Sequence, residues 1–419
     1  MHEPVARLEG VIREYAWGSH STLAQLQRRA WPTAAPEAEL WLGAHPLAPA
    51  VLCGADGART PLDAAVRGAP DRMLGEPVVQ RYGSTLPFLM KVLAVESPLS
   101  LQVHPDRRQA RVGFEDEEAR GIARDAPGRV FRDCWGKPEL LCARSPMQVL
   151  CGFRPIADSV RLLRSLEISA LDHVVGMLAD DGEVVLGQVV HRLLTWPPPQ
   201  RAGLVGEVAA ALDGLARRGD RFAASARWMA ALADRYRDDP GVVVALLLNL
   251  VDLAPGQAVQ VSTGMPHAYL RGTGIEVMTT SDNVVRGGLT AKHVDVERLL
   301  AVLDPSAGPP PVVTAEHIGG ERRYPSTSPA FRLSQRDVTE RVTISGGGPQ
   351  VLLTVDGVIE VDAPPSQYHP GRSLTLGPGQ AAFVPASTQA LELRGEGTVF
   401  RATTAVATGP EERPASAQR

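Results

Sequence analysis

Cysteine is scarce in this chain, and the few cysteines are not arranged in pairs. The 419 residues include four, Cys53, Cys134, Cys142 and Cys151, and none of them forms a C-x-x-C motif. A chain of this length buries enough apolar surface to fold without disulfide bonds. We therefore expect reduced thiols and a cytoplasmic protein. A zinc–thiolate site is the alternative use for these side chains.

Long apolar runs and basic runs are also absent. The longest apolar run, residues 242–248, is far shorter than the ~20 residues that a membrane-spanning helix needs. The first ten residues, MHEPVARLEG, do not follow the pattern of a signal peptide. The formal net charge is −4. We therefore expect neither a membrane nor a nucleic acid as the main partner.

Aromatic residues make up only 5% of the chain, whereas glycine and proline are abundant. The 40 glycines and 35 prolines indicate many short strands joined by turns. Residues 156–250 differ, because apolar side chains recur there at helical spacing, as in Val160, Leu163 and Leu166. This region is predicted to be a helical block between two β regions. Its histidines, His173 and His191, are interpreted as ordinary helix residues.

The second β region contains an internal repeat. LAPGQAVQV at residues 253–261 resembles LGPGQAAFV at residues 376–384, which predicts a Pro-Gly turn followed by a strand in both places. Aligned without a gap, the second copy has Ala390 where the first has His267. Two related barrels are expected, the second without a metal site. Asp356–Gly357 is predicted as a hairpin turn, and residues 409–419 as a disordered tail.

One stretch, SPLSLQVHPD at residues 97–106, is central to the function. Residues 99–104 alternate between apolar and polar side chains, so Ser100, Gln102 and His104 are predicted to share one face of a strand that ends at Pro105. Polar side chains on the inner wall of a barrel are costly unless something binds them. A metal ion is one explanation, and a histidine that faces solvent from an edge strand is the other.

Three further stretches contain similar chemistry. They are GKPEL at residues 136–140, GMPHAYL at 264–270 and EVMTTSDNVVRGGLT at 276–290. Together with the first stretch they offer one amide oxygen, one carboxylate and two imidazoles, from Gln102, His104, Glu139 and His267. This set suits zinc with a position left open, and iron or manganese also fits by ligand type.

Charged residues accompany this ligand set. Lys137, Glu276, Asp282 and Arg286 lie in the same stretches, and cations of this kind suit an anionic sugar phosphate or a developing oxyanion. For each charge taken alone, a surface ion pair is the simpler explanation. Lys91, within the apolar residues 86–93, is either buried with a partner or reaches solvent from the end of a strand.

The ordered set of motifs is similar to that of the type I mannose-6-phosphate isomerase family, also called phosphomannose isomerases. The matching pieces are YAWGS, AELWLGAHP, PFLMKVL, SLQVHPD, KPEL, MPHAYL and EVMTTSDNVVRGGLT. They cover the N-terminal third and the segment 253–290. Thr279 and Thr280 stand where the family motif commonly has Ala-Asn, a small departure.

The resemblance implies a mainly β fold with an α insertion, built from cupin-like, jelly-roll barrels. A discontinuous catalytic barrel would comprise residues 1–155 and 251–329. A helical insertion at 156–250 and a C-terminal jelly-roll domain at 330–408 would complete the fold.

The resemblance also implies an activity, the interconversion of mannose 6-phosphate and fructose 6-phosphate through an enediol-type intermediate. The expected partner is a small sugar phosphate, and the protein is expected to be a monomer. One zinc ion per chain would be held by Gln102, His104, Glu139 and His267. Arg286, Lys137 and Glu276 would be catalytic, with either Glu276 or Lys137 as the base, and the substrate-binding residues would be Ser100, Tyr269, Asp282 and Trp17.

Two other functions fit parts of the pattern. His104-Pro105-Asp106 with a distant His267 resembles the two-histidine, one-carboxylate triad of non-haem Fe(II) oxygenases, although it leaves Gln102 and Glu139 unused. A sugar-sensing or storage barrel without catalysis is the third hypothesis. Activity that requires O2 would favour the oxygenase, and absence of isomerisation would favour the sugar-sensing or storage barrel.

Overall fold

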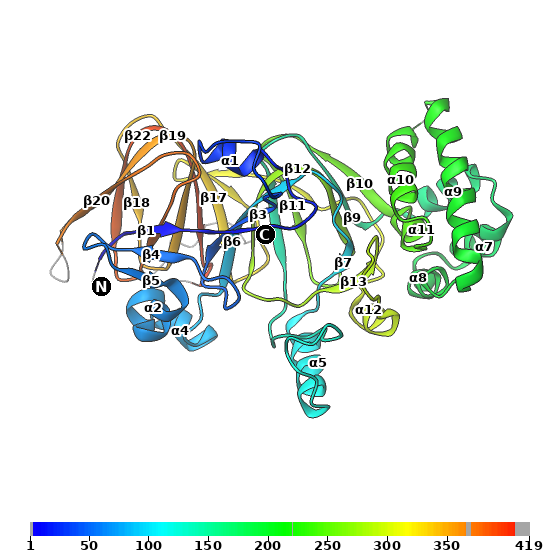
Figure 1. The fold of residues 1–419 in the computed structure, drawn as a ribbon, viewed down its shortest axis with the longest axis horizontal. Helices are drawn as coiled ribbons and strands as arrows, with labels where there is room; N and C mark the ends of the chain where they lie inside the picture. The colour runs from blue at the N-terminus through cyan, green and yellow to red at the C-terminus, as the bar shows by residue number, and fades with distance from the viewer. Residues whose placement is uncertain (1–2, 220, 366–369, 407–419) are drawn as a thin grey trace, which may run out of the picture. The chain divides into compact units, whose positions relative to one another are not determined.

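The computed structural model describes residues 3–219, 221–365 and 370–406 (Figure 1). The chain divides into two units. Unit 1 comprises Met1–Ala94, Ile275–Thr280 and Thr314–Arg419, and unit 2 comprises Val95–Gly274 and Ser281–Val313. The tail predicted at residues 409–419 lies outside the described residues. Within the described part, the strands form two antiparallel sheets, and a helical region accompanies them.

The strands of unit 1 come from both ends of the chain. Most of them are short, as the glycine and proline content predicts. One sheet lies entirely within it, in the order β15-β16-β17-β22-β19-β21-β1-β4-β5, with β18 on β22 and β20 on β19. β2 and β6 pair with the two edges of β3. The elements of unit 1 are β1 (Ala6–Glu9), β2 (Val11–Arg13), α1 (Thr22–Leu26), β3 (Glu39–Gly43), β4 (Val51–Cys53), β5 (Arg59–Pro61), α2 (Leu62–Gly68), α3 (Pro70–Leu74), α4 (Glu76–Tyr82), β6 (Phe88–Val95), β15 (Glu316–Ile318), β16 (Glu321–Tyr324), β17 (Arg332–Val338), β18 (Val342–Ser345), β19 (Gln350–Ala363), β20 (Arg372–Leu376), β21 (Ala381–Val384) and β22 (Ala390–Thr403).

Unit 2 combines antiparallel strand pairs with the helical region. β7 pairs with β13 and β12, β12 with β9, β9 with β10, and β8 with β11. The elements that begin in unit 2 are β7 (Leu101–Val103), α5 (Arg107–Ala119), β8 (Glu139–Ala143), β9 (Met147–Phe153), α6 (Ile156–Ser165), η1 (Ser169–Leu171), α7 (Asp172–Asp181), η2 (Gly182–Val185), α8 (Leu186–Leu194), α9 (Pro198–Arg218), α10 (Ala223–Arg235), α11 (Gly241–Ala245), β10 (Leu248–Leu253), β11 (Gln257–Val261), β12 (His267–Thr279), β13 (Val285–Gly288), α12 (Val296–Val302) and β14 (Val312–Thr314).

The repeated Pro-Gly-Gln sequence forms the same turn twice, as predicted. In each copy a positive-φ glycine, Gly256 or Gly379, follows the proline. The glutamine side chain then accepts a hydrogen bond from the start of its own turn, from the backbone N–H of Ala254 at 2.9 Å or of Gly377 at 3.0 Å. β11 and β21 follow these turns. The repeat therefore encodes a common turn-and-strand unit.

The hairpin turn predicted at Asp356–Gly357 is wrong. Both residues lie inside β19, where the register with β22 shifts between Thr354 and Asp356. Gly357 has a φ of 72°, and a Cβ at this position would lie 1.9 Å from the carbonyl oxygen of Glu396. A β-bulge and a hairpin turn both need a residue with positive φ, and the glycine of an Asp-Gly pair supplies it in either case. The Asp-Gly pair alone therefore does not distinguish a turn from a bulge.

Two predictions from composition can be compared with the described residues. All four cysteines are free, as expected. Among the helices that the structure describes, none has the length and apolar character required to span a lipid bilayer.

Candidate metal centre

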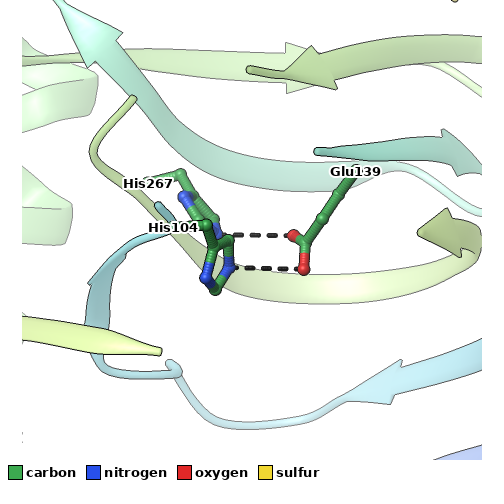
Figure 2. Close-up of side chains that lie close together, drawn as sticks. All are labelled: His104, Glu139 and His267. Atoms are coloured by element: carbon green, nitrogen blue, oxygen red, sulfur yellow. Dashed lines mark ion pairs between the residues drawn. The ribbon is translucent and has the colours of Figure 1, made fainter. Parts of the chain in front are cut away.

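Three buried side chains converge in unit 2: His104, Glu139 and His267 (Figure 2). Their potential ligand atoms all lie within 4.8 Å of one another. His104 Nε2 is 3.3 Å from Glu139 Oε1, and His267 Nε2 is 3.5 Å from Glu139 Oε2. The two imidazoles thus face the two oxygens of one carboxylate, which is an N/O donor set suited to a divalent cation.

Strand ends position these three residues. His104 directly follows β7, Glu139 is the first residue of β8, and His267 is the first residue of β12. A proline adjoins each of them. Because proline has no backbone N–H, it interrupts the hydrogen bonds between neighbouring strands at these points. The predicted strand over residues 99–104 is shorter in the structure, where β7 covers Leu101–Val103.

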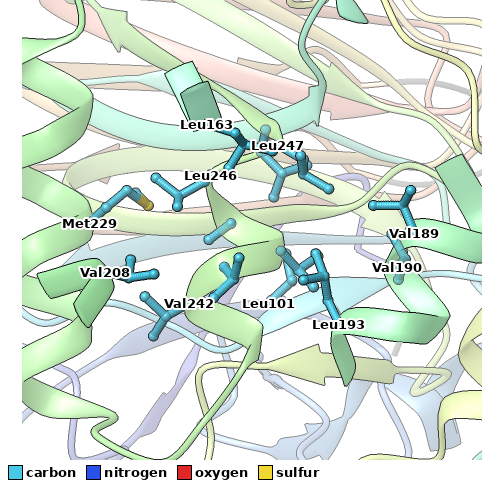
Figure 3. Close-up of a cluster of buried hydrophobic side chains, with 14 of the residues drawn as sticks. Leu101, Leu163, Val189, Val190, Leu193, Val208, Met229, Val242, Leu246 and Leu247 are labelled. Carbon is cyan, nitrogen blue, oxygen red and sulfur yellow. The ribbon is translucent and has the colours of Figure 1, made fainter. Parts of the chain in front are cut away.

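The hydrophobic core holds β7 in place. Leu101 and Val103 are both 1% exposed and belong to the same apolar cluster as the buried side chains of the helical region. Figure 3 draws Leu101 together with other members of this cluster, among them Val242 of α11 and Leu193 of α8. Because side chains alternate along a strand, Gln102 points away from this cluster. The helical region therefore anchors the strand that presents the site.

Backbone carbonyls orient both imidazoles. His104 Nδ1 lies 2.8 Å from the carbonyl oxygen of Asn283, and His267 Nδ1 lies 3.1 Å from that of Met265. A carbonyl oxygen only accepts hydrogen bonds, so each Nδ1 carries the proton and each Nε2 presents its lone pair to the site. His104 Nε2 is buried and has no hydrogen-bond partner. An orphaned, buried lone pair of this kind fits a metal ligand.

The electrostatics favour the protonation states that a metal requires. Burial, with the nearby Lys137 charge, lowers the pKa of His104 to about 4. Burial also lowers the pKa of His267, against the opposing effect of Glu139. For Glu139 burial acts to raise the pKa, but Lys137 and the two histidines hold it well below the ordinary value. The cluster therefore contains two neutral imidazoles and one carboxylate near neutral pH.

Lys137 and Tyr269 complete the surroundings of Glu139. Lys137 Nζ is 3.1 Å from Glu139 Oε1, and its backbone N–H donates to the carbonyl of Pro105 at 3.1 Å. The Tyr269 hydroxyl donates to Glu139 Oε2 at 3.3 Å. Both side chains are buried. Two of the predicted active-site residues thus contact the carboxylate directly.

Gln102 is flanked by two other predicted residues. The antiparallel register places it opposite His267 of β12 and opposite Arg286 of β13. Directly opposite residues in such pairs present their side chains on the same face, about 5 Å apart at Cβ. Gln102, His267 and Arg286 therefore share one face, and Ser100 immediately precedes β7.

Two cations that the sequence interpretation missed, Arg132 and Lys292, interact electrostatically with the region of Arg286. Burial and the charge of Arg132 lower the pKa of Arg286, and the charges of Arg286 and Arg132, together with burial, lower that of Lys292. Among the described residues, no salt bridge to an acidic side chain is present for any of the three. Uncompensated cations in one place favour an anionic ligand.

Asp282, the other acidic residue of unit 2 that was predicted to belong to the site, lies in a hydrogen-bonded loop. Its backbone N–H donates to Asp133 Oδ2 at 2.8 Å. Asp133 also accepts from the Ser281 hydroxyl and from the backbone N–H of Trp135. Burial raises the pKa of Asp133. Asp133 was not predicted, because a single acid in an irregular loop has no sequence pattern.

Glu276 and Trp17 belong to unit 1. Glu276 Oε2 is 3.1 Å from Lys91 Nζ, which also lies 3.8 Å from Glu39 Oε2 and 5.2 Å from the centre of the Trp41 ring. Lys91 is therefore a buried lysine with partners. Trp17 stacks on Tyr15, with the ring centroids 5.9 Å apart.

Asp106 has a structural role that argues against the oxygenase triad. It is the N-cap of α5, where its carboxylate accepts from the backbone N–H of Gln109 at 2.7 Å. In return, the backbone N–H of Asp106 donates to Gln109 Oε1 at 2.8 Å. This capping box fully explains an acid after His-Pro.

In the second copy of the Pro-Gly-Gln repeat, Ala390 begins β22 as His267 begins β12 in the first copy. The second copy therefore lacks the imidazole of His267.

Comparison with known proteins agrees with this geometry. Residues 5–156 match the family model described as the catalytic domain of type I phosphomannose isomerase. The chain is 33% identical over 398 residues to the mannose-6-phosphate isomerase of Escherichia coli K12, covering 94% of this chain and 98% of that protein. It is 30% identical over 392 residues to the human mannose-6-phosphate isomerase, covering 86% and 89%.

Solved structures are similar over almost the whole chain. One is the mannose 6-phosphate isomerase of Salmonella typhimurium bound to its substrate, fructose 6-phosphate, and to zinc, with a TM-score of 0.86 and 32% sequence identity. The match covers 96% of this chain and 99% of that one.

Proposed function

Because the chain belongs to the mannose-6-phosphate isomerase family, we propose that it interconverts mannose 6-phosphate and fructose 6-phosphate. The observation that carries the proposal is the buried cluster of His104, Glu139 and His267, whose ligand atoms could hold a metal ion. The chain also has relatives of that name over nearly its full length. Cupin-like barrels over residues 1–155 with 251–329 and over 330–408, with a helical insertion at 156–250, are part of the proposal. A cytoplasmic, monomeric protein is part of the same proposal.

The proposed metal is a single zinc ion. His104 Nε2, His267 Nε2 and a Glu139 oxygen would hold it, with the Gln102 amide oxygen as a fourth ligand from the same face as His267. When bound, zinc supplies Lewis-acid polarisation and orders the substrate in the pocket. The zinc-bound Salmonella structure supports this choice over iron or manganese.

The cations around Arg286 have two proposed tasks. Arg286 lies opposite Gln102, on the same face as His267, and would stabilise the negative charge that develops as the enediol-type intermediate forms. Arg132 acts electrostatically on Arg286, and both act on Lys292. Arg132 and Lys292 would bind the phosphate of the sugar. Ser100, Tyr269, Asp282 and Trp17 are proposed as further substrate-binding residues.

Aldose–ketose exchange moves a proton between adjacent carbons, and two residues are proposed for this step. Lys137, whose ammonium lies 3.1 Å from Glu139, is one candidate for the base. Glu276, paired with Lys91, is the carboxylate that the family motif supplies. A pH profile of each single variant, Lys137→Met and Glu276→Gln, separates them, since loss of the base removes the acidic limb of the profile.

A direct assay tests the function. The zinc-loaded protein is incubated with fructose 6-phosphate, and the products are followed by NMR in air and under argon. We expect mannose 6-phosphate at equal rates in both atmospheres. Absence of mannose 6-phosphate would favour a non-catalytic sugar-binding barrel, and a requirement for O2 would favour the oxygenase.

A further inference from the structure

Asn283 uses its whole side chain to hold a neighbouring loop. The side chain is fully buried. Its Oδ1 accepts from the backbone N–H of Arg132 at 2.7 Å and of Asp133 at 3.3 Å. Its Nδ2 donates to the carbonyls of Trp135 at 2.8 Å and Asp133 at 2.9 Å. Nδ2 also lies 3.2 Å from Asp133 Oδ1, so every donor and acceptor position of the amide has a partner.

The backbone of the same residue contacts the candidate metal centre. The Asn283 carbonyl accepts the hydrogen bond from His104 Nδ1 at 2.8 Å, in a fully buried environment. This bond selects the imidazole form whose Nε2 faces Glu139. Asn283 therefore connects the first histidine of the site with the loop at residues 132–135.

This loop needs an external support. Residues 130–138 contain no helix or strand, yet they lead from Arg132 to Lys137 and then to Glu139 at the start of β8. Asp133 reinforces the junction, because its carboxylate accepts from the backbone N–H of Asp282 and from the Ser281 hydroxyl. Arg286 lies only three residues after Asn283.

We propose that Asn283 is the positioning residue of the metal centre, which fixes the metal-binding tautomer of His104 and, through its side-chain amide, the position of the loop that carries Arg132 and Lys137. Its role in turnover rests on the function proposed above, whereas its role in metal binding does not. Groups behind metal-binding histidines typically change metal affinity 10- to 100-fold when they are mutated.

The test variant is Asn283→Asp, which keeps the shape but replaces the two N–H donors that face the Asp133 and Trp135 carbonyls. The matched control is Asn249→Asp. Asn249 is the only other asparagine in the sequence, and its Nδ2 likewise donates to backbone carbonyls, those of Cys151, Gly152 and Gly308. Both variants place a carboxylate against main-chain oxygens, so both lose stability. Asn283→Asp in addition places its carboxylate beside Asp133 Oδ1, which Asn283 Nδ2 contacts at 3.2 Å.

Two measurements without sugar distinguish positioning from general stability. Zinc affinity is measured by chelator competition, and the tautomer of His104 is read from histidine 15N shifts of the metal-free protein, assigned with His104→Gln. Asn283→Asp should bind zinc 10- to 100-fold more weakly than wild type and lose the pure Nδ1–H form, while Asn249→Asp stays within threefold. Equal zinc affinities in the two variants would overturn the proposal.

If Asn283→Asp does not fold, Asp133→Asn takes its place. This variant keeps Asn283 but weakens the acceptor for Ser281 and for the backbone of Asp282, and it changes the contact of Asp133 Oδ1 with Asn283 Nδ2 at 3.2 Å. It should reduce zinc affinity at least fivefold, and unchanged affinity would overturn the proposal. The isomerase assay on the wild type tests the proposed function separately. If the wild type binds zinc through His104 but does not isomerise sugar phosphates, the proposed function is wrong and the positioning role of Asn283 is unaffected.

Discussion

The ammonium of Lys137 lies 3.1 Å from Glu139 Oε1, the same oxygen that faces His104 Nε2 at 3.3 Å. Without a metal, this lysine is the nearest full positive charge to a carboxylate that is 3% exposed. A buried carboxylate is stable as an anion only with such a partner. Lys137 therefore preserves the ionised form of Glu139 before a cation binds.

Replacing Lys137 by methionine should destabilise the metal-free protein more than the zinc-loaded one. Breaking one side of a buried ion pair costs about 3–5 kcal/mol, because the remaining charge loses its partner. A bound zinc ion would replace the missing charge and offset most of the loss. Denaturant unfolding with and without zinc measures the difference, and equal losses in both forms would show that Glu139 does not depend on Lys137.

The metal-free protein should lose stability between pH 6.5 and about pH 4 through His104. Its folded-state pKa is about 4, below the ordinary 6.5, so in this window the unfolded chain takes up a proton that the folded chain does not. The stability is complete above pH 6.5 and falls by about 3 kcal/mol as the pH reaches 4.

The pH dependence is measured by urea unfolding in a chelator. His104→Gln should flatten the curve in this window. His173→Gln, which removes an exposed histidine from α7, serves as the control and should leave the curve unchanged. A wild-type curve that is flat from pH 6.5 to 4 would argue against a buried neutral His104.

Replacing Arg286 by alanine should reduce turnover far more than zinc content. Removal of one group that stabilises transition-state charge typically costs about 10²–10³ in kcat. Steady-state kinetics give kcat, and elemental analysis gives zinc per chain. A variant with normal turnover would remove Arg286 from the mechanism.

Lys292→Met should raise KM for fructose 6-phosphate about tenfold and change kcat little. Loss of one charge-assisted contact to phosphate corresponds to ~1.5 kcal/mol. Arg120→Met is a suitable control, since it removes another exposed cation, one that pairs with Asp116 on α5. If both variants have the wild-type KM, Lys292 does not bind the phosphate.

The sequence identified the metal-binding candidates because each lies in a short motif at a strand end. His104, Glu139 and His267 adjoin prolines, and their residue types are those that metals require. The structure brings them together although 163 positions separate the first from the last (267 minus 104). The turns of the Pro-Gly-Gln repeat could also be predicted from the sequence, because their hydrogen bonds join residues that are neighbours in the chain.

Other features depend on contacts that no local pattern encodes. Arg132 and Lys292 approach Arg286 from separate loops. Asn283 was visible only as one letter of a motif, and its hydrogen bonds reach a loop about 150 positions away. Asp356–Gly357 was misassigned because positive φ serves a bulge as well as a turn, and only the pairing of β19 with β22 distinguishes the two.

A zinc titration tests the central claim most directly. The metal-free protein receives zinc in steps while isomerisation of fructose 6-phosphate is followed, with Glu139→Gln as the matched variant that lacks the carboxylate charge. We predict that activity rises linearly and reaches its plateau at one zinc per chain, and that Glu139→Gln needs at least 100-fold more free zinc. Full activity in the metal-free protein, or a Glu139→Gln titration identical to wild type, would contradict the account.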